Sequence, residues 1–514
     1  MNKKIEEIFA NISITEGWPV EQKRVLIGGI KPYDGPVIEV YSSICRDGLP
    51  IYLGSYPRIS EEMALDCLRV AHKAWNLGKG KWPMLSHSLR CKAVRKFADM
   101  MEKKIDIIAD RIMWEICKTK ADAYGEVTRT IQYIRDSCDK LEELDQQWTN
   151  WTENSGLMIN TTRNPRGIVL CMGPANYPLN ETFTTLIPAL LMGNIVLFKP
   201  AKDGVLLLEP LLEAFNECFP EGVITTLYGD GREIITPIQK TGKVDVLSFI
   251  GGTRTADAII GNNPTPHKTK AILGLGAKNP GIILPRADLD AVIKDCIKGT
   301  LSYNGQRCTA LKILFVHSSI REAFLKKFVD AVNALNPGLP WEEGVQLTPV
   351  LPGTVPWFTG LIEDAKTRGA QILNECGGLV NGGYIHPAVI FPVNKQMKLY
   401  REEQFGPIVP IVEFEDINEV LEWVYTSSFG QQISVFGTEE DHNDIAYIID
   451  STKNQTCRIN INAVCQRGPD DVPFTGRGDS AMGTLDLLNA LLELSIEYVQ
   501  SIPISWKNLI DRYN

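Results

Sequence analysis

The sequence contains few cysteines and no two cysteines in a CxxC spacing. Twelve of its 514 residues are cysteine, whereas small secreted domains held together by disulfides contain roughly 8–10%. CxxC pairs are typical of structural zinc sites and dithiol redox sites. These absences favour reduced thiols, as in cytosolic proteins. We therefore expect a cytoplasmic location.

The chain also lacks an excess of positive charge and a long hydrophobic run. It carries 53 Lys and Arg against 62 Asp and Glu, a formal net charge of −9, which is unfavourable for binding nucleic acid. The most apolar window, residues 185–198, is interrupted by Pro188, Gly193 and Asn194 and is too short to span a bilayer. Residues 1–17 lack the apolar core of a signal peptide. We expect neither a nucleic-acid partner nor membrane insertion.

Histidine is scarce and dispersed. The six histidines, at positions 72, 87, 267, 317, 386 and 442, form no cluster with metal-ligand spacing and no HExxH motif. Because catalytic zinc sites draw on such spacings, we expect no catalytic metal.

Alternating strand and helix patterns run through most of the chain. A single hydrophobic core stops growing at roughly 250–300 residues. A chain of 514 residues is therefore expected to contain at least two domains. Expected strands occupy residues 167–173, 195–198, 223–227 and 244–250, and expected helices follow over 180–192 and 205–218. Apolar strands alternating with helices indicate an α/β fold with a parallel sheet covered on both faces. A second α/β unit is expected over 279–462.

One segment presents a candidate nucleophile. Residues 303–310 read YNGQRCTA and place Cys308 directly after Arg307. An adjacent guanidinium favours the thiolate, which is the reactive form of cysteine. The alternative is a buried cysteine that only packs, the commonest state of a free thiol.

A second segment could stabilise an oxyanion. Residues 173–178 read GPANYP and follow an expected strand. The Asn176 amide lies between two prolines and could donate a fixed hydrogen bond, as an oxyanion hole requires. The alternative is a proline-rich turn in which asparagine serves the backbone conformation.

Five motifs in register resemble the aldehyde dehydrogenase superfamily over residues 40–500. They are GQRCTA with Cys308, GPANYP with Asn176, LFKP with Lys199, the turn FIGGT at 249–253, and EEQFGP with Glu403. The segments CQRGPD at 465–470 and VPFTG at 472–476 are similar to the non-phosphorylating glyceraldehyde-3-phosphate dehydrogenase branch.

The resemblance implies an architecture with three parts. A Rossmann-type cofactor domain would comprise residues 1–135, 164–278 and 463–490, and an α/β catalytic domain residues 279–462. A small β oligomerisation arm would comprise residues 136–163 and 491–514. Because such arms pair between subunits, we expect a homodimer or homotetramer.

The resemblance also implies a mechanism and a cofactor. Cys308 would attack the aldehyde carbonyl, Asn176 and the Cys308 backbone N–H would hold the oxyanion, and water would hydrolyse the thioester after hydride transfer. Expected cofactor-binding residues are Lys199, Lys202, Gly229, Gly251, Gly252, Glu403 and Phe405. Relatives that prefer NAD often carry glutamate three residues after the lysine of LFKP. The cation Lys202 stands there, so we expect NADP, with NAD less favoured.

The expected substrate is a phosphorylated small-molecule aldehyde. Arg129, Tyr177, Arg307 and Arg467 match the positions that bind substrate phosphate in that branch, and guanidinium groups suit phosphate. The predicted reaction is oxidation of D-glyceraldehyde 3-phosphate to 3-phosphoglycerate. Alternatives are a dehydrogenase for another anionic aldehyde or semialdehyde, and a silent nucleotide-binding protein of the same fold.

The glutamate base of the family is absent. Deacylation in the family uses a glutamate in an ELGGK-like segment, and here the segment reads LGLGAK with Gly274 at that position. Some relatives read LGLEAK, with the acid two residues on, where this chain has Gly276. Three explanations stay open: a variant trapped as the acyl-enzyme, replacement by another carboxylate such as Glu402, or transfer of the acyl group to a different nucleophile.

Overall fold

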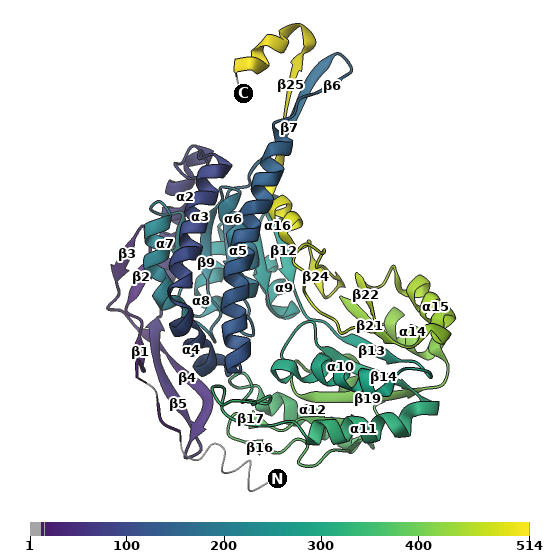
Figure 1. Ribbon diagram of the computed structural model, residues 1–514. Helices are drawn as coiled ribbons and strands as arrows, with labels where there is room; N and C mark the ends of the chain where they lie inside the picture. The colour runs from purple at the N-terminus through teal and green to yellow at the C-terminus, as the bar shows by residue number, and fades with distance from the viewer. Residues whose placement is uncertain (1–11, 15, 513–514) are drawn as a thin grey trace.

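The computed structural model describes residues 12–14 and 16–512. Residues 1–11 and 15 of the predicted cofactor domain, and residues 513–514 of the predicted arm, lie outside the described residues. Figure 1 shows two lobes, each built around a sheet, and a narrow arm that projects from one end.

The first lobe begins with short strands and four helices. The strands are β1 (Val20–Glu21), β2 (Arg24–Leu26), β3 (Ile30–Pro32), β4 (Val37–Arg46) and β5 (Leu49–Pro57). The helices are α2 (Glu61–Trp75), α3 (His87–Glu102), α4 (Ile105–Ile116) and α5 (Lys120–Trp148). Helices α3, α4 and α6 all contact α5, which therefore forms the centre of this helical layer.

A six-stranded sheet forms the core of the first lobe. Its order is β10-β9-β8-β11-β12-β24, with β24 as the antiparallel edge and the other five strands parallel. These strands are β8 (Ile168–Met172), β9 (Ile195–Lys199), β10 (Ile224–Thr226), β11 (Val246–Ile250), β12 (Lys270–Gly274) and β24 (Ala481–Met482). The strand order reverses between β8 and β11, and doubly wound sheets bind their ligands beyond the strand ends at such a point.

The helices of this sheet follow the expected pattern with one correction. They are α6 (Asn180–Leu191), α7 (Leu212–Cys218), α8 (Gly231–Lys240), α9 (Thr253–Gly261) and α16 (Leu487–Glu493). The single helix expected over 205–218 is wrong, because a 3₁₀ segment at Leu206–Leu211 precedes α7. Pro210 lies within that segment and has no N–H for α-helical hydrogen bonding.

A seven-stranded sheet forms the core of the second lobe. Its order is β15-β18-β19-β14-β13-β21-β22, parallel except for β15. The strands are β13 (Asn279–Ile283), β14 (Leu311–His317), β15 (Gln371–Ile372), β18 (Ala388–Phe391), β19 (Ile408–Phe414), β21 (Gln432–Phe436) and β22 (Arg458–Ile461). The helices are α10 (Leu289–Leu301), α11 (Arg321–Asn333), α12 (Val355–Thr367), α13 (Lys398–Arg401), α14 (Ile417–Tyr425) and α15 (His442–Thr452).

The projecting arm is a three-stranded antiparallel sheet in the order β25-β7-β6. It comprises β6 (Thr152–Asn154), β7 (Leu157–Pro165) and β25 (Ser495–Pro503). The predicted start of the arm at residue 136 falls inside α5, whose last turns are held by buried Leu141 and Leu144. The strands of the two large sheets fall on either side of the predicted boundaries at 278/279 and 462/463.

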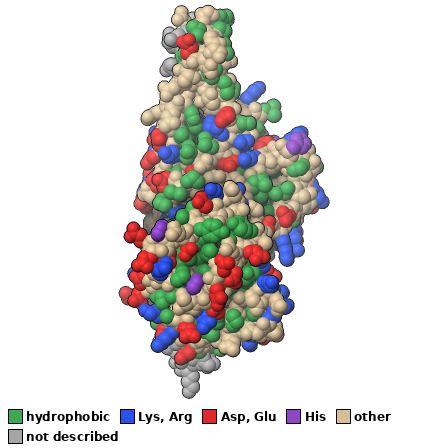
Figure 2. Space-filling model, turned by 90° about the vertical axis from the view of Figure 1, so that its right-hand side faces the viewer, with side chains coloured by type: hydrophobic (Ala, Val, Ile, Leu, Met, Phe, Trp, Pro, Cys, Tyr) green, Lys and Arg blue, Asp and Glu red, His purple; other side chains and the backbone are tan. Residues whose placement is uncertain are grey.

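The surface shows apolar side chains on the arm and on one side of the second lobe. Ile496, Tyr498 and Val499 of β25 are exposed, as are Tyr447 of α15 and Ile461 of β22. Figure 2 faces the side of Figure 1 on which β22 and α15 lie, and shows hydrophobic side chains gathered there below the arm. Among the described residues, no helix is long and apolar enough to cross a membrane.

Candidate active site

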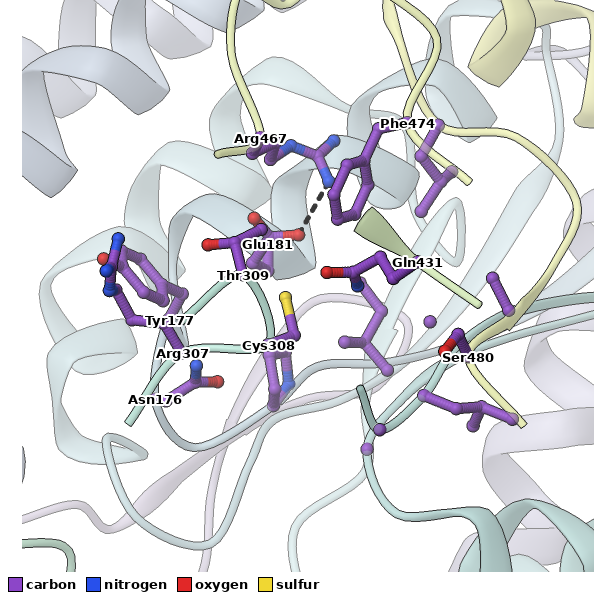
Figure 3. A pocket seen from close by; sticks show the side chains of 18 of the residues that line it. Asn176, Tyr177, Glu181, Arg307, Cys308, Thr309, Gln431, Arg467, Phe474 and Ser480 are labelled. Atoms are coloured by element: carbon purple, nitrogen blue, oxygen red, sulfur yellow. Dashed lines mark hydrogen bonds and ion pairs between the residues drawn. The ribbon is translucent and has the colours of Figure 1, made fainter. Parts of the chain in front are cut away.

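A cavity of about 450 Å³ opens between the two lobes. The first lobe lines it with residues that follow β8, β11 and β12, and the second lobe with the loops that hold residues 307–309 and 403–405. Six predicted catalytic and substrate residues line this one cavity: Arg129, Asn176, Tyr177, Arg307, Cys308 and Arg467. Figure 3 shows the Cys308 sulfur directed into it.

The loop that carries Cys308 is held in an unusual backbone conformation. Tyr303, Asn304 and Gly305 all have positive φ angles, of 48°, 53° and 70°. A Cβ atom on Gly305 would lie 2.6 Å from the Thr300 carbonyl oxygen, so this position requires glycine. The Asn304 side-chain amide donates to the Thr348 carbonyl at 2.8 Å. The polar residues of the motif therefore fix the position of Cys308, the candidate nucleophile.

The environment of Cys308 favours the thiol over the thiolate. Burial raises its pKa, the carboxylate of Glu181 raises it further, and Lys312 opposes both effects. The Arg307 guanidinium is turned toward helix α10, where it donates to the carbonyls of Lys298 and Gly299. The expectation that Arg307 lowers the thiol pKa is therefore wrong.

Asn176 is buried next to the nucleophile (Figure 3). Its Nδ2 donates one hydrogen bond to the Gln306 carbonyl at 2.9 Å, which fixes the amide against the Cys308 loop. A primary amide carries a second N–H, as the proposed oxyanion hole requires.

Two of the three arginines are already paired with carboxylates. Arg129 donates to Asp470 at 2.8 Å, and Arg467 Nη1 lies 2.9 Å from a carboxylate oxygen of Glu181. The Nε atoms of Arg307 and Arg467 are buried and have no hydrogen-bond partner within the described part of the chain. Buried N–H groups of this kind are usually satisfied, which is consistent with an anion completing the site.

Sequence reasoning missed Glu181. It lies in the first turn of α6, five residues after Asn176, and lines the cavity with its side chain mostly buried. An acidic residue in the first turn of a helix is normally explained by the helix dipole. The pattern gave no signal that the carboxylate faces Cys308 and Arg467; only the packing of α6 against the loop after β22 shows it (Figure 3).

Tyr177 lies over a buried ammonium group. The Nζ of Lys118 is 3.2 Å from the centre of its ring, and the Lys118 side chain is fully buried. A cation over the face of a tyrosine ring is attracted to it. Lys118 therefore helps to fix the position of the Tyr177 ring, which lines the cavity.

The two glycines at the expected base differ in the room they leave. A Cβ atom on Gly274 would meet Ile250 at 3.2 Å, a tight contact with one aliphatic side chain. A Cβ atom on Gly276 would lie 2.7 Å from Oε2 of Glu403 and 3.1 Å from the Phe429 ring. A Cβ atom at position 274 therefore needs only a small shift of Ile250, whereas one at position 276 requires the Glu403 carboxylate to move.

The predicted cofactor residues fall into two groups. Gly251, Gly252, Glu403 and Phe405 line the cavity. Gly252 precedes α9, and a Cβ atom placed there would meet open space among the described residues. Lys199, Lys202 and Gly229 lie at or beyond the carboxyl ends of β9 and β10, outside the cavity. This arrangement fits an extended dinucleotide whose phosphates approach an open helix N-terminus.

Two further side chains named from the sequence, Cys465 and Glu402, lie outside the catalytic arrangement. Cys465 is buried, its sulfur lies 3.2 Å from the Ser434 hydroxyl, and burial raises its pKa to about 11, so it packs as a structural thiol. Glu402 is exposed and does not line the cavity, so the suggestion that it replaces the missing base is wrong. Within residues 12–14 and 16–512 no group of His, Cys, Asp and Glu is arranged to hold a metal.

Known proteins resemble this chain over most of its length. An NADP-dependent glyceraldehyde-3-phosphate dehydrogenase of Streptococcus equinus is 33% identical over 440 residues, 84% of this chain and 89% of that protein. An alpha-ketoglutaric semialdehyde dehydrogenase of Bacillus subtilis is 30% identical, over 75% of this chain and 80% of that protein. The crystal structure of an NADP-dependent glyceraldehyde-3-phosphate dehydrogenase from Bacillus halodurans, complexed with NADP, is 31% identical with a TM-score of 0.85, and covers 94% of this chain and 100% of that one. The aldehyde dehydrogenase family matches residues 49–497, and this chain therefore belongs to that family.

Proposed function

We propose that this protein oxidises D-glyceraldehyde 3-phosphate to 3-phosphoglycerate with NADP. The observation that carries the proposal is the convergence of Cys308 and Asn176 with Arg129, Arg307 and Arg467 in one cavity. A phosphorylated aldehyde needs both a nucleophile with an oxyanion donor and cationic groups for its phosphate. The relatives named for this reaction support the same substrate.

NADP is the cofactor that the residues fit. Lys202 is exposed on the loop after β9, close in sequence to half-buried Lys199, and two cations suit an additional phosphate better than a hydroxyl. Bound NADP would supply the acceptor for the hydride of the aldehyde. A steady-state comparison in which NAD gives the higher kcat/KM would contradict this assignment.

The residues of the chain perform the remaining steps. Cys308 loses its proton and forms a bond to the aldehyde carbon, while the Asn176 amide and the Cys308 backbone N–H stabilise the oxyanion. Loss of a hydride from this adduct, for which bound NADP would be the acceptor, leaves a thioester on Cys308. Hydrolysis then needs a base for water, and Gly274 and Gly276 provide none. We therefore propose that deacylation limits turnover.

A semialdehyde carrying a carboxylate is the second candidate substrate. Asp470 and Glu181 already compensate two of the three arginines, which leaves less positive charge than a phosphate dianion favours. The resemblance to an alpha-ketoglutaric semialdehyde dehydrogenase points the same way. A silent nucleotide-binding protein is disfavoured because Cys308 and Asn176, the proposed nucleophile and oxyanion donor, line the same cavity.

Binding of the substrate phosphate by Arg467 predicts the effect of Arg467→Leu. We expect this change to raise KM for glyceraldehyde 3-phosphate by roughly 10- to 100-fold, because a charge-assisted hydrogen bond is lost and Glu181 is left unpaired beside the phosphate. The KM for unphosphorylated glyceraldehyde should change little. Parallel steady-state kinetics on the two aldehydes check the prediction; equal changes in KM would contradict phosphate binding at Arg467.

Cofactor affinity should depend on pH through Lys199. Burial lowers the pKa of its ammonium group to about 8. Below that pH Lys199 is cationic and attracts the cofactor, and above it the amine is neutral, so the Kd for NADP should rise as pH rises through 8. Calorimetric titrations on both sides of pH 8 measure this. Lys199→Arg keeps the charge and should flatten the profile; an unchanged profile in this variant would exclude Lys199 as the titrating group.

We also propose a homo-oligomer, a homodimer or homotetramer, located in the cytoplasm. The exposed apolar residues Ile496, Tyr498 and Val499 on the arm support self-association, since large exposed apolar patches commonly mark interfaces. The net charge of −9 offers no support for a nucleic-acid partner.

A further inference from the structure

The cavity around Cys308 contains two carboxylates among its described lining residues, Glu181 and Glu403. Neither stands at the position of the family's base, where the chain has Gly274. Hydrolysis of the thioester on Cys308 needs a group that takes a proton from water. Among the described residues that line the cavity, these two carboxylates are the candidates for that role.

Glu403 is already engaged by fixed partners. Its Oε1 lies 2.8 Å from Nζ of the buried Lys312 and accepts a hydrogen bond from the Ala277 N–H at 3.0 Å. Lys312 also donates to the Cys308 carbonyl, so these contacts hold the backbone around the nucleophile. A carboxylate that must break two such contacts is poorly placed to exchange protons.

Glu181 pairs with a residue of the proposed substrate site. Its carboxylate is bound by Arg467 at 2.9 Å, and both side chains are almost buried, with 12% and 6% exposed. Figure 3 shows Glu181 between Arg467 and the loop of Cys308 and Thr309, on the side toward which the sulfur points. The negative charge of Glu181 is also the largest charge effect on the Cys308 thiol, whose pKa it raises.

The substrate itself can free this carboxylate. A phosphate or carboxylate bound at Arg467 competes with Glu181 for the same guanidinium. Once the guanidinium is shared with the substrate anion, the Glu181 carboxylate no longer has Arg467 as its full ion-pair partner and can accept a hydrogen bond from water. The anionic group of the substrate, when it binds Arg467, would thus free the Glu181 carboxylate to act as a base beside the thioester.

We propose that Glu181 is the general base of deacylation in this protein, in place of the absent glutamate. This inference rests on the proposed function. Water donates a proton to Glu181 as its oxygen bonds to the thioester carbon; the C–S bond then breaks, and the Cys308 sulfur regains the proton from Glu181. Thioester and water thus become carboxylic acid and thiol, and no further reactant is needed.

The test compares four proteins by stopped-flow NADPH formation and intact-protein mass spectrometry. They are the wild type, Glu181→Gln, the exposed control Glu402→Gln, and Glu181→Gln combined with Gly274→Glu. Because general bases contribute roughly 10²–10⁴-fold, we expect Glu181→Gln to keep the first-turnover burst and lose about 10²-fold in steady-state rate. An acyl adduct should accumulate on Cys308. Glu402→Gln should match the wild type.

The double variant separates catalysis from packing. If Glu181 acts only as the partner of Arg467, a glutamate at position 274 cannot restore turnover; if it acts as base, turnover should recover. A full burst with an unchanged steady-state rate in Glu181→Gln, or no recovery in the double variant, overturns the assignment. Absence of any NADPH formation by the wild type with glyceraldehyde 3-phosphate contradicts the proposed substrate instead, and the relative steady-state rates of the four proteins with glyceraldehyde then decide the role of Glu181.

Discussion

Replacement of Cys308 by alanine should abolish NADPH formation from aldehydes, with a loss of roughly 10⁵-fold or more, as found when a covalent nucleophile is removed. Of the twelve cysteines, Cys308 is the one found among the described residues that line the cavity with Asn176 and the arginines. Stopped-flow absorbance with glyceraldehyde 3-phosphate and NADP should show neither a burst nor steady turnover. Binding of NADP should persist.

Cys457→Ser is the matched control for this experiment. Cys457 is exposed and does not line the cavity, so its loss should leave turnover unchanged. It also removes an accessible thiol that would react with alkylating reagents. Because burial raises the pKa of the Cys308 thiol, alkylation of Cys308 in the Cys457→Ser protein should accelerate as pH increases. Full activity in Cys308→Ala would contradict the mechanism.

Replacement of Gly274 by glutamate should increase the steady-state rate and remove the burst. The change places a carboxylate at the carboxyl end of β12, in the wall of the cavity, and needs only a small shift of Ile250. General-base catalysis contributes roughly 10²–10⁴-fold, and Glu181 already supplies part of it. We expect an increase of about 10-fold or more in kcat.

Two controls define the origin of that increase. Gly274→Gln adds a side chain of the same size without a basic group, so its burst should remain. Gly276→Glu would press its Cβ atom against the Glu403 carboxylate, and should weaken NADP binding without accelerating deacylation. If the burst of Gly274→Glu stays as large as that of the wild type, hydrolysis of the thioester does not limit turnover.

Local sequence was sufficient for the α/β fold and for naming most of the predicted residues that line the candidate site. Strands such as β8 and β9 are buried almost throughout, so their apolar runs stand out without any knowledge of their neighbours. The Cys308 loop is similarly local, since the positive φ angles of Tyr303, Asn304 and Gly305 are set within the motif itself. These features depend on residues near one another in the chain.

Features that depend on contacts between residues far apart in the chain could not be predicted from local sequence. The full length of α5 follows from how Leu141 and Leu144 are buried in the first lobe. The thiol pKa also differed from expectation, because the Arg307 side chain turns to the carbonyls of α10 and leaves burial as the dominant effect on Cys308.

The family can be read from the sequence by itself, and so can the candidate nucleophile, the candidate oxyanion donor and the absence of the usual base, because each belongs to a short motif of fixed spacing. Only the tertiary structure decided which charges meet at the nucleophile. Glu181 and Arg467 are 286 residues apart and form one buried pair, while the sequence neighbour Arg307 is turned away. Electrostatic interaction depends on distance in space and on burial, and neither can be read from position along the chain.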